Sequence, residues 1–183
     1  MSGSQWQDEL TPILRQSQIV SGALILGCVT FFGVAIAVPG EAAPIDPNLP
    51  ILTYAAIGFA VMALIARWMV PGIVASTTRR KIIAGTWRLP THAPARTVAF
   101  VERTGDAGRL AMALMTGTIV SGALLEGIAF FALVAYLLER SPLSLILAGA
   151  MILGLLTQVP TRGRLVGWIE EQFGLIEQER HLG

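Results

Sequence analysis

One acidic side chain lies where chemistry inside a membrane is possible. Glu126 falls within the long apolar stretch Leu110–Leu138, sixteen residues after its start and twelve before its end. An ionised carboxylate at that depth costs a few kcal/mol. We expect no Lys or Arg at comparable depth, because Arg67 lies near the cytoplasmic end of its own apolar stretch. Desolvation therefore favours the protonated, neutral form of Glu126.

A neutral carboxyl group in apolar surroundings needs hydrogen-bond partners. The candidate hydroxyl groups belong to Ser21, Thr30, Thr118 and Ser121. Thr118, Gly122 and Glu126 follow one another at helical spacing, and such small residues let helices approach closely. We therefore expect Glu126 to face another helix, with Thr118, Ser121, Gly122 and Ser21 as its support. Two interpretations remain open: a carboxyl group that bridges helices, and one that takes up and releases an ion.

Other reactive groups form no recognisable site. A single cysteine, Cys28, excludes an internal disulfide, and two distant histidines offer no metal-ligand spacing. The sequence contains no phosphate-binding loop, nucleophile triad or haem motif. We therefore expect no autonomous enzyme, no cofactor and no metal.

The composition is that of an integral membrane protein. The 183 residues are 54% apolar and 14% charged, against roughly a quarter charged in soluble domains. Helices of about 20 apolar residues span a bilayer, and four stretches pass this length test: Ile19–Val38, Ile51–Val70, Leu110–Leu138 and Pro142–Val159. Pro71-Gly72 is expected to close the second. A secretory signal is the alternative for the first stretch, but the run is long for one and Asp8 and Glu9 precede it.

Basic residues predict the orientation. Seven of them lie between the second and third stretches: Arg79, Arg80, Lys81, Arg88, Arg96, Arg103 and Arg109. The loop after the first stretch has Glu41 and Asp46 but no basic residue. Both termini are therefore expected in the cytoplasm, with the chain in a bacterial-type inner membrane. The net charge of +1 gives no reason to expect a nucleic-acid partner.

The chain contains an internal repeat. Residues 19–37 laid over 119–137 match at ten of nineteen positions, including a shared IVSGAL block. Leu26 in the first copy stands where Glu126 stands in the second. Because the link between the copies stays cytoplasmic, the two helical hairpins have the same orientation.

The segments outside the hairpins are shorter. We expect a cytoplasmic segment at 1–18, hairpins at 19–71 and 110–160, a basic connection at 72–109 and a tail at 161–183. Apolar residues at three- and four-residue steps predict an amphipathic interfacial helix in the tail, packed on the basic connection or on a partner protein: Leu165, Trp168, Ile169, Phe173 and Ile176. Residues 74–83 predict a shorter basic counterpart, and residues 86–100 are expected to be irregular.

Met115–Leu138, with its small residues before an acid and an aromatic pair after it, resembles the carboxylate-bearing helix of the ATP synthase c subunit. A duplicated hairpin with one acid lost is similar to the proteolipids of V-type ATPases. The resemblance implies that Glu126 is an ion-carrying carboxylate. Sodium-binding members have a hydroxyl and a Tyr where this chain has Gly127 and Phe131, so the implied ion is a proton.

The sequence thus predicts an all-α protein of four transmembrane helices in two tandem hairpins, plus the amphipathic helix. The leading hypothesis is a proteolipid-like, proton-carrying subunit of an oligomeric membrane complex, in contact with the lipid bilayer. The alternative is a non-catalytic structural or accessory subunit in which Glu126 only bridges helices. A solute transporter ranks third, since one ionisable group leaves little with which to bind solutes.

Overall fold

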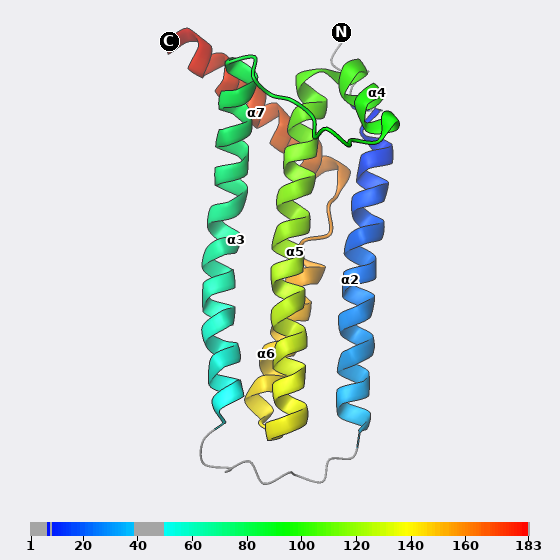
Figure 1. The fold of residues 1–183 in the computed structure, drawn as a ribbon, viewed down its shortest axis with the longest axis vertical. Helices are drawn as coiled ribbons and strands as arrows, with labels where there is room; N and C mark the ends of the chain where they lie inside the picture. Colours follow the sequence, from blue (N-terminus) through cyan, green and yellow to red (C-terminus); the bar gives the residue numbers. More distant parts are fainter. Residues whose placement is uncertain (1–6, 8, 39–49, 183) are drawn as a thin grey trace. The chain divides into compact units, whose positions relative to one another are not determined.

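The fold is helical throughout the described part of the chain. The structure is a computed structural model that describes residue 7 and residues 9–38 and 50–182. Its helices are α2 (Thr11–Ala37), α3 (Ile51–Ile83), α4 (Ala95–Thr104), α5 (Asp106–Glu139), α6 (Pro142–Leu156) and α7 (Arg162–Leu182) (Figure 1). The predicted all-α class is confirmed for these residues. The expected loop around Glu41 and Asp46 lies outside them.

Three of the four expected spans are present at full length. Helices α2, α3 and α5 are long and apolar enough to cross a membrane. Helix α6 has 15 residues, which at 1.5 Å per residue is about 22 Å, less than a hydrocarbon core of about 30 Å. The chain is therefore compatible with a multi-pass membrane protein, with three candidate spans by length and composition.

The expectation that Pro71-Gly72 ends the second helix is wrong. Helix α3 continues through Pro71 to Ile83. An interior proline removes one backbone hydrogen bond and costs about 3 kcal/mol or more. Burial of the residues beyond it offsets this cost, since Ala75, Thr78 and Ile82 are all buried. The expected separate helix at 74–83 is instead the last part of α3.

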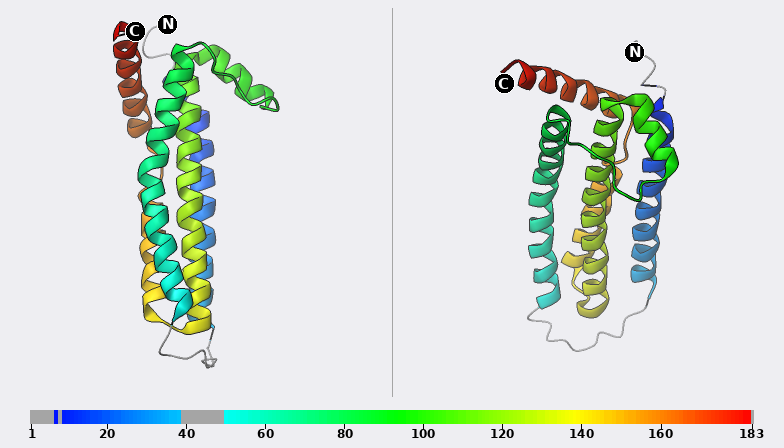
Figure 2. Two further views of the ribbon diagram at one scale, coloured as in Figure 1. Left: turned by 60° about the vertical axis from the view of Figure 1, so that its left-hand side comes forward. Right: turned by 45° about the horizontal axis from the view of Figure 1, so that its top comes forward.

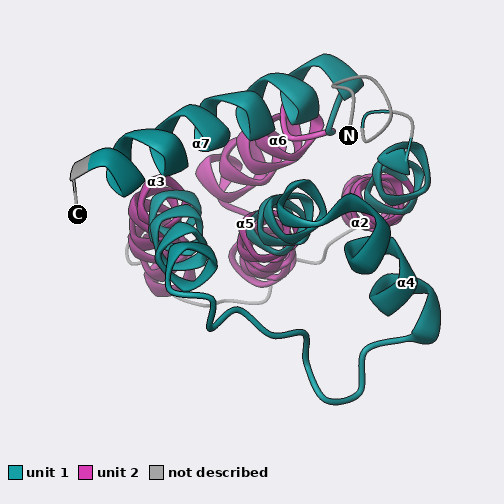
Figure 3. Cartoon of the chain, turned by 90° about the horizontal axis from the view of Figure 1, so that it is seen from above, with its two compact units in different colours: residues 1–18, 70–118, 160–183 teal, residues 19–69, 119–159 magenta. Residues whose placement is uncertain are grey.

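The chain divides into two compact units, and α2, α3 and α5 contribute residues to both (Figure 3). Unit 1 comprises residues 1–18, 70–118 and 160–183. Unit 2 comprises residues 19–69 and 119–159.

Unit 2 is a bundle of the apolar parts of three helices together with α6. In it α2, α5 and α3 run alongside one another in both views of Figure 2. Its interior is built largely from alanine, which allows close helix packing. The fully buried alanines are Ala35, Ala56, Ala129, Ala132, Ala135 and Ala148.

Unit 1 has a core of larger side chains. Leu10, Ile82, Phe100 and Leu110 pack there with three residues of α7: Leu165, Ile169 and Ile176. The tail is therefore helical and packs on residues of the basic connection, as the sequence predicts. Arg79 fixes the same helix through polar contacts, donating to Gln172 Oε1 at 2.5 Å and pairing with Glu179 at 3.2 Å.

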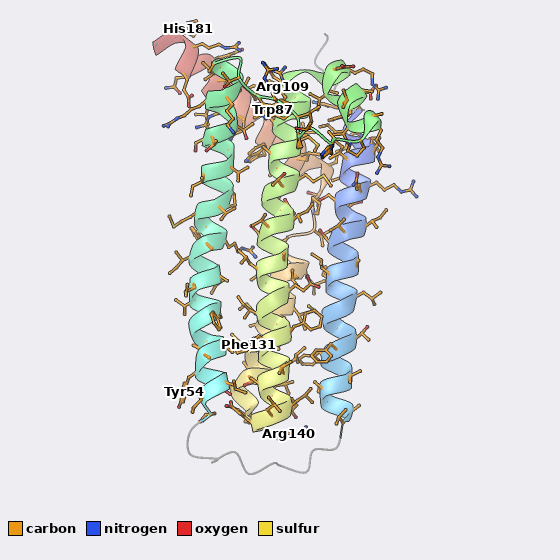
Figure 4. All side chains as sticks on the ribbon, in the orientation of Figure 1. Tyr54, Trp87, Arg109, Phe131, Arg140 and His181 are labelled. Carbon is orange, nitrogen blue, oxygen red and sulfur yellow. The ribbon has the colours of Figure 1, made fainter. Side chains whose placement is uncertain are left out.

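The basic connection contains more helix than the sequence predicts. Helix α4 begins at Ala95, within the stretch expected to be irregular, because Phe100, Val101 and Thr104 give it one buried face. Gly105, with φ +59°, makes the joint to α5, a backbone conformation that favours glycine. Arg109 of α5 lies 5.5 Å from the ring of Trp87 (Figure 4).

Candidate functional site

Glu126 lies on the part of α5 that belongs to unit 2. The described residues of unit 2 carry four charged side chains: Arg67, Glu126, Glu139 and Arg140. Glu139 and Arg140 stand at the end of α5, so Glu126 is the acidic group within the helix. Its side chain is half-buried. Gly122 and Phe130, one turn to either side of Glu126, both contact α2, so Glu126 lies on the α2 side of α5.

The two copies of the repeat pack against each other here. Leu24 Cδ1 lies 3.3 Å from the position that a Cβ atom on Gly122 would occupy. Phe130 Cζ lies 3.9 Å from the same position on Gly27, and the rings of Phe31 and Phe130 have centroids 5.3 Å apart. Later residues of α2 contact later residues of α5, so the two helices are parallel. Contacting residues are about 100 positions apart, which is the spacing of the repeat. Glu126 lies one turn after Gly122 and one turn before Phe130.

The predicted supporting hydroxyls do not hold the carboxyl group. Thr118 donates to the backbone carbonyl of Leu114 in its own helix, at 3.0 Å. The Oγ atom of Ser121 is buried without a hydrogen-bond partner. Within the described residues, no hydrogen bond joins Glu126 to Ser21, Ser121 or Thr118. The expectation that Gly122 allows close helix packing agrees with the structure, because Leu24 of α2 packs where a side chain on Gly122 would lie.

Gln158 is a polar group that the sequence interpretation overlooked. Its Oε1 atom lies 3.8 Å from the position that a Cβ atom on Gly122 would have. Both amide atoms of Gln158 are buried without a hydrogen-bond partner. A polar residue two positions after the end of α6 is a weak sequence signal, since such residues commonly follow a span.

Arg67 lies deeper in the bundle than expected. Its Nη1 atom is 4.0 Å from the position that a Cβ atom on Gly154 would have, and Leu125 Cδ1 is 3.3 Å from the same position. The guanidinium group therefore reaches the level of Leu125, the neighbour of Glu126 in sequence. The expectation that no Arg lies at comparable depth is wrong, because α3 continues to Ile83 and Arg67 lies well inside the helix instead of near its end.

A second carboxylate, missed by the sequence interpretation, ties three helices together. Glu139 accepts hydrogen bonds from the backbone N–H groups of Leu52 and Thr53, at 2.6 and 2.9 Å, and from the Thr53 hydroxyl at 2.6 Å. The Thr53 and Ser144 hydroxyls are 2.6 Å apart. The N–H groups at the start of a helix lack intrahelical acceptors, so Glu139 of α5 caps α3, and Ser144 extends the link to α6.

The site offers no evident metal centre. Across the described ranges, no group of three or more His, Cys, Asp and Glu side chains is placed to hold a metal ion. Comparisons of the chain with protein-family models, with curated proteins and with solved structures find no match.

Proposed function

We propose that the chain is a proton-carrying subunit of an oligomeric membrane complex, and that Glu126 takes up and releases the proton. The observation that carries the proposal is a half-buried carboxyl group, inside an apolar helix, that makes no hydrogen bond to another described residue. Glu126 lies on the α2 side of α5, and among the described residues its carboxyl group has no hydrogen bond or ion pair. A carboxyl group without hydrogen-bond partners can gain or lose a proton without breaking hydrogen bonds.

The structural alternative assigns Glu126 to bridging helices. In unit 2 that task falls to Glu139, which accepts three hydrogen bonds from α3. A bridging role at Glu126 calls for similar contacts, and the contrast between the two carboxyl groups favours the carrier.

A polar group one turn from Glu126 supports a path for protons. Both amide atoms of Gln158 are buried without partners, and Gln158 lies beside Gly122. Buried polar groups of this kind commonly bind water. The proposed path runs from Glu126 past Gln158 toward the end of α6.

The topology that goes with this function has four spans and two cytoplasmic termini. Helix α6 would cross together with residues 157–159, and the excess of basic residues between the hairpins would stay in the cytoplasm. The resemblance to the rotor proteolipids is part of the same proposal, and it is carried by residues 115–138.

Labelling with a hydrophobic carbodiimide tests the proposal, because the reagent attacks protonated carboxyl groups in apolar surroundings. In native membranes we expect modification at Glu126 that declines as the pH rises. Glu139 is the matched control on the same helix, and its three hydrogen bonds should protect it. Failure to label Glu126 at any pH, or equal labelling of Glu139, would contradict the proposal.

Proton movement is the second measurement. Vesicles containing the native complex should lose proton flux with Glu126→Gln, which keeps the size and polarity of the side chain but cannot titrate. Glu126→Asp should retain part of the flux. Full flux in the Gln variant would exclude Glu126 as the carrier.

A further inference from the structure

The contact between α2 and α5 uses residues that occur a second time in the chain. Leu24, Gly27 and Phe31 of α2 form this contact. One hundred residues later the same three residue types recur on α5, as Leu124, Gly127 and Phe131. The face of α2 that is covered inside the chain therefore has a copy on α5.

That copy lines an open apolar groove in unit 2. Leu124, Gly127 and Phe131 form one wall of a cavity of about 390 Å³, and α3 forms the other with Phe59, Met62, Ala63 and Ala66. Figure 4 shows Phe131 between α3 and α5, where its ring meets Phe59 edge-on at 5.6 Å. A Cβ atom on Gly127 would meet no atom within 4 Å, whereas one on Gly27 would meet Phe130.

The receiving face of the contact also occurs twice. On α5 it consists of Gly122, Glu126 and Phe130, and the equivalent residues of α2 are Gly22, Leu26 and Thr30. All three α2 residues are exposed, Leu26 to 66%. A Cβ atom on Gly22 would meet no atom within 4 Å. Unit 2 of every copy of the chain therefore has two uncovered surfaces. One is the groove beside Gly127, and the other is the Gly22–Leu26–Thr30 face of α2, which is equivalent to the α5 face that α2 covers inside the chain.

We propose that the groove binds α2 of a second copy of this chain, through its Gly22–Leu26–Thr30 face. Two copies inserted in one membrane have the same orientation, so the incoming α2 runs parallel to α5, as it does inside the chain. The two surfaces differ, so the contact is head-to-tail and can repeat from copy to copy. The inference rests on the repeat and the groove, and it holds whether or not Glu126 carries a proton.

Disulfide cross-linking tests the register of this contact. In a Cys28→Ala background, Thr30→Cys and Gly127→Cys on the same chain should yield a ladder of multimers upon oxidation in membranes. Each single variant should give no ladder, because a head-to-tail contact brings each position to the other and never to itself. Ile19→Cys with Gly127→Cys is the matched control: Ile19, like Thr30, is exposed, but it lies eleven residues from Thr30, about 16 Å along the helix. A ladder in that control, or none in the Thr30 pair, would overturn the proposal.

Filling the groove tests the same contact without cysteines. Gly127→Leu should convert the oligomer to monomers in bilayers, as counted by single-molecule photobleaching. Gly149→Leu is the control on α6, since a Cβ atom there would also meet no atom within 4 Å, and it should leave the oligomer unchanged. Circular dichroism checks that both variants remain helical. A native chain that is monomeric would show that an acyl chain or another protein occupies the groove, and would refute the proposal.

The two proposals fail separately. Glu126→Gln should abolish proton flux and leave the Thr30–Gly127 cross-link intact. Gly127→Leu should disrupt the oligomer while leaving Glu126 reactive toward carbodiimide.

Discussion

The carboxylate of Glu139 accepts two hydrogen bonds from Thr53, one from its backbone N–H at 2.9 Å and one from its hydroxyl at 2.6 Å. The two residues are 86 positions apart in the chain. This contact joins the end of α5 to the start of α3, and with Ser144 it fixes one end of the unit 2 bundle.

Loss of the Glu139 carboxylate should destabilise the protein. Glu139→Gln keeps one acceptor oxygen but places an N–H group toward the N–H groups of α3. We expect a loss of about 1–3 kcal/mol in the free energy of unfolding, measured by reversible unfolding in mixed micelles. Glu126→Gln is the control, and should cost less because the carboxyl group that it replaces has no hydrogen bond. Equal losses would contradict the capping role.

The Thr53–Ser144 link should show energetic coupling. Thr53→Val and Ser144→Ala each disrupt the hydroxyl pair, so the double variant should lose less stability than the two single variants together. We expect an interaction energy of about 1 kcal/mol from a double-mutant cycle. Ser76, whose hydroxyl donates to the carbonyl of Ile73 in its own helix, supplies the comparison. Thr53→Val combined with Ser76→Ala should be additive.

Arg79 should hold α7 in place within unit 1. Its side chain is 16% exposed and contacts both Gln172 and Glu179. We expect Arg79→Gln to cost about 1 kcal/mol, which corresponds to roughly fivefold faster amide exchange in α7. Hydrogen-exchange mass spectrometry provides the measurement. Arg80→Gln changes the exposed neighbouring residue and should leave α7 protected; similar exchange in both variants would refute the assignment.

Two glycines of unit 1 should respond oppositely to alanine. A Cβ atom on Gly108 would collide with Thr104 Oγ1 and lie 3.1 Å from Phe100 Cε1. Gly108→Ala must therefore displace the Thr104 hydroxyl from the Phe100 carbonyl, to which it donates at 2.7 Å. We expect a loss of about 1–3 kcal/mol.

Gly167 of α7 is the counterpart, since a Cβ atom there would meet no atom within 4 Å. Gly167→Ala should stabilise the helix by about 0.5–1 kcal/mol. Thermal unfolding of both variants separates the two effects. A stabilised Gly108→Ala variant would show that Thr104 can move without cost.

The sequence alone determined the helical class and the helical tail, and of the four spans that it predicted, three are present as full-length apolar helices. It also revealed the repeat that places Leu26 and Glu126 at equivalent positions. These features are local, because apolar length and three- to four-residue spacing are properties of a single segment. The prediction that the second helix ends at Pro71 was wrong. Proline disfavours a continuing helix locally, but burial of Ala75 and Ile82 farther along α3 stabilises the helix beyond it.

Tertiary structure alone decided which side of α5 each residue faces. Apart from Glu126, apolar and small residues occur on all sides of α5 through its span, so its sequence does not separate the α2 side from the α3 side. Packing set those faces: it turned Gly122, Glu126 and Phe130 toward α2, brought Arg67 to the level of Leu125, and left Gly127 uncovered. The cap on α3 likewise depends on the antiparallel course of α3 and α5, which brings Glu139 to Thr53 only in the folded chain.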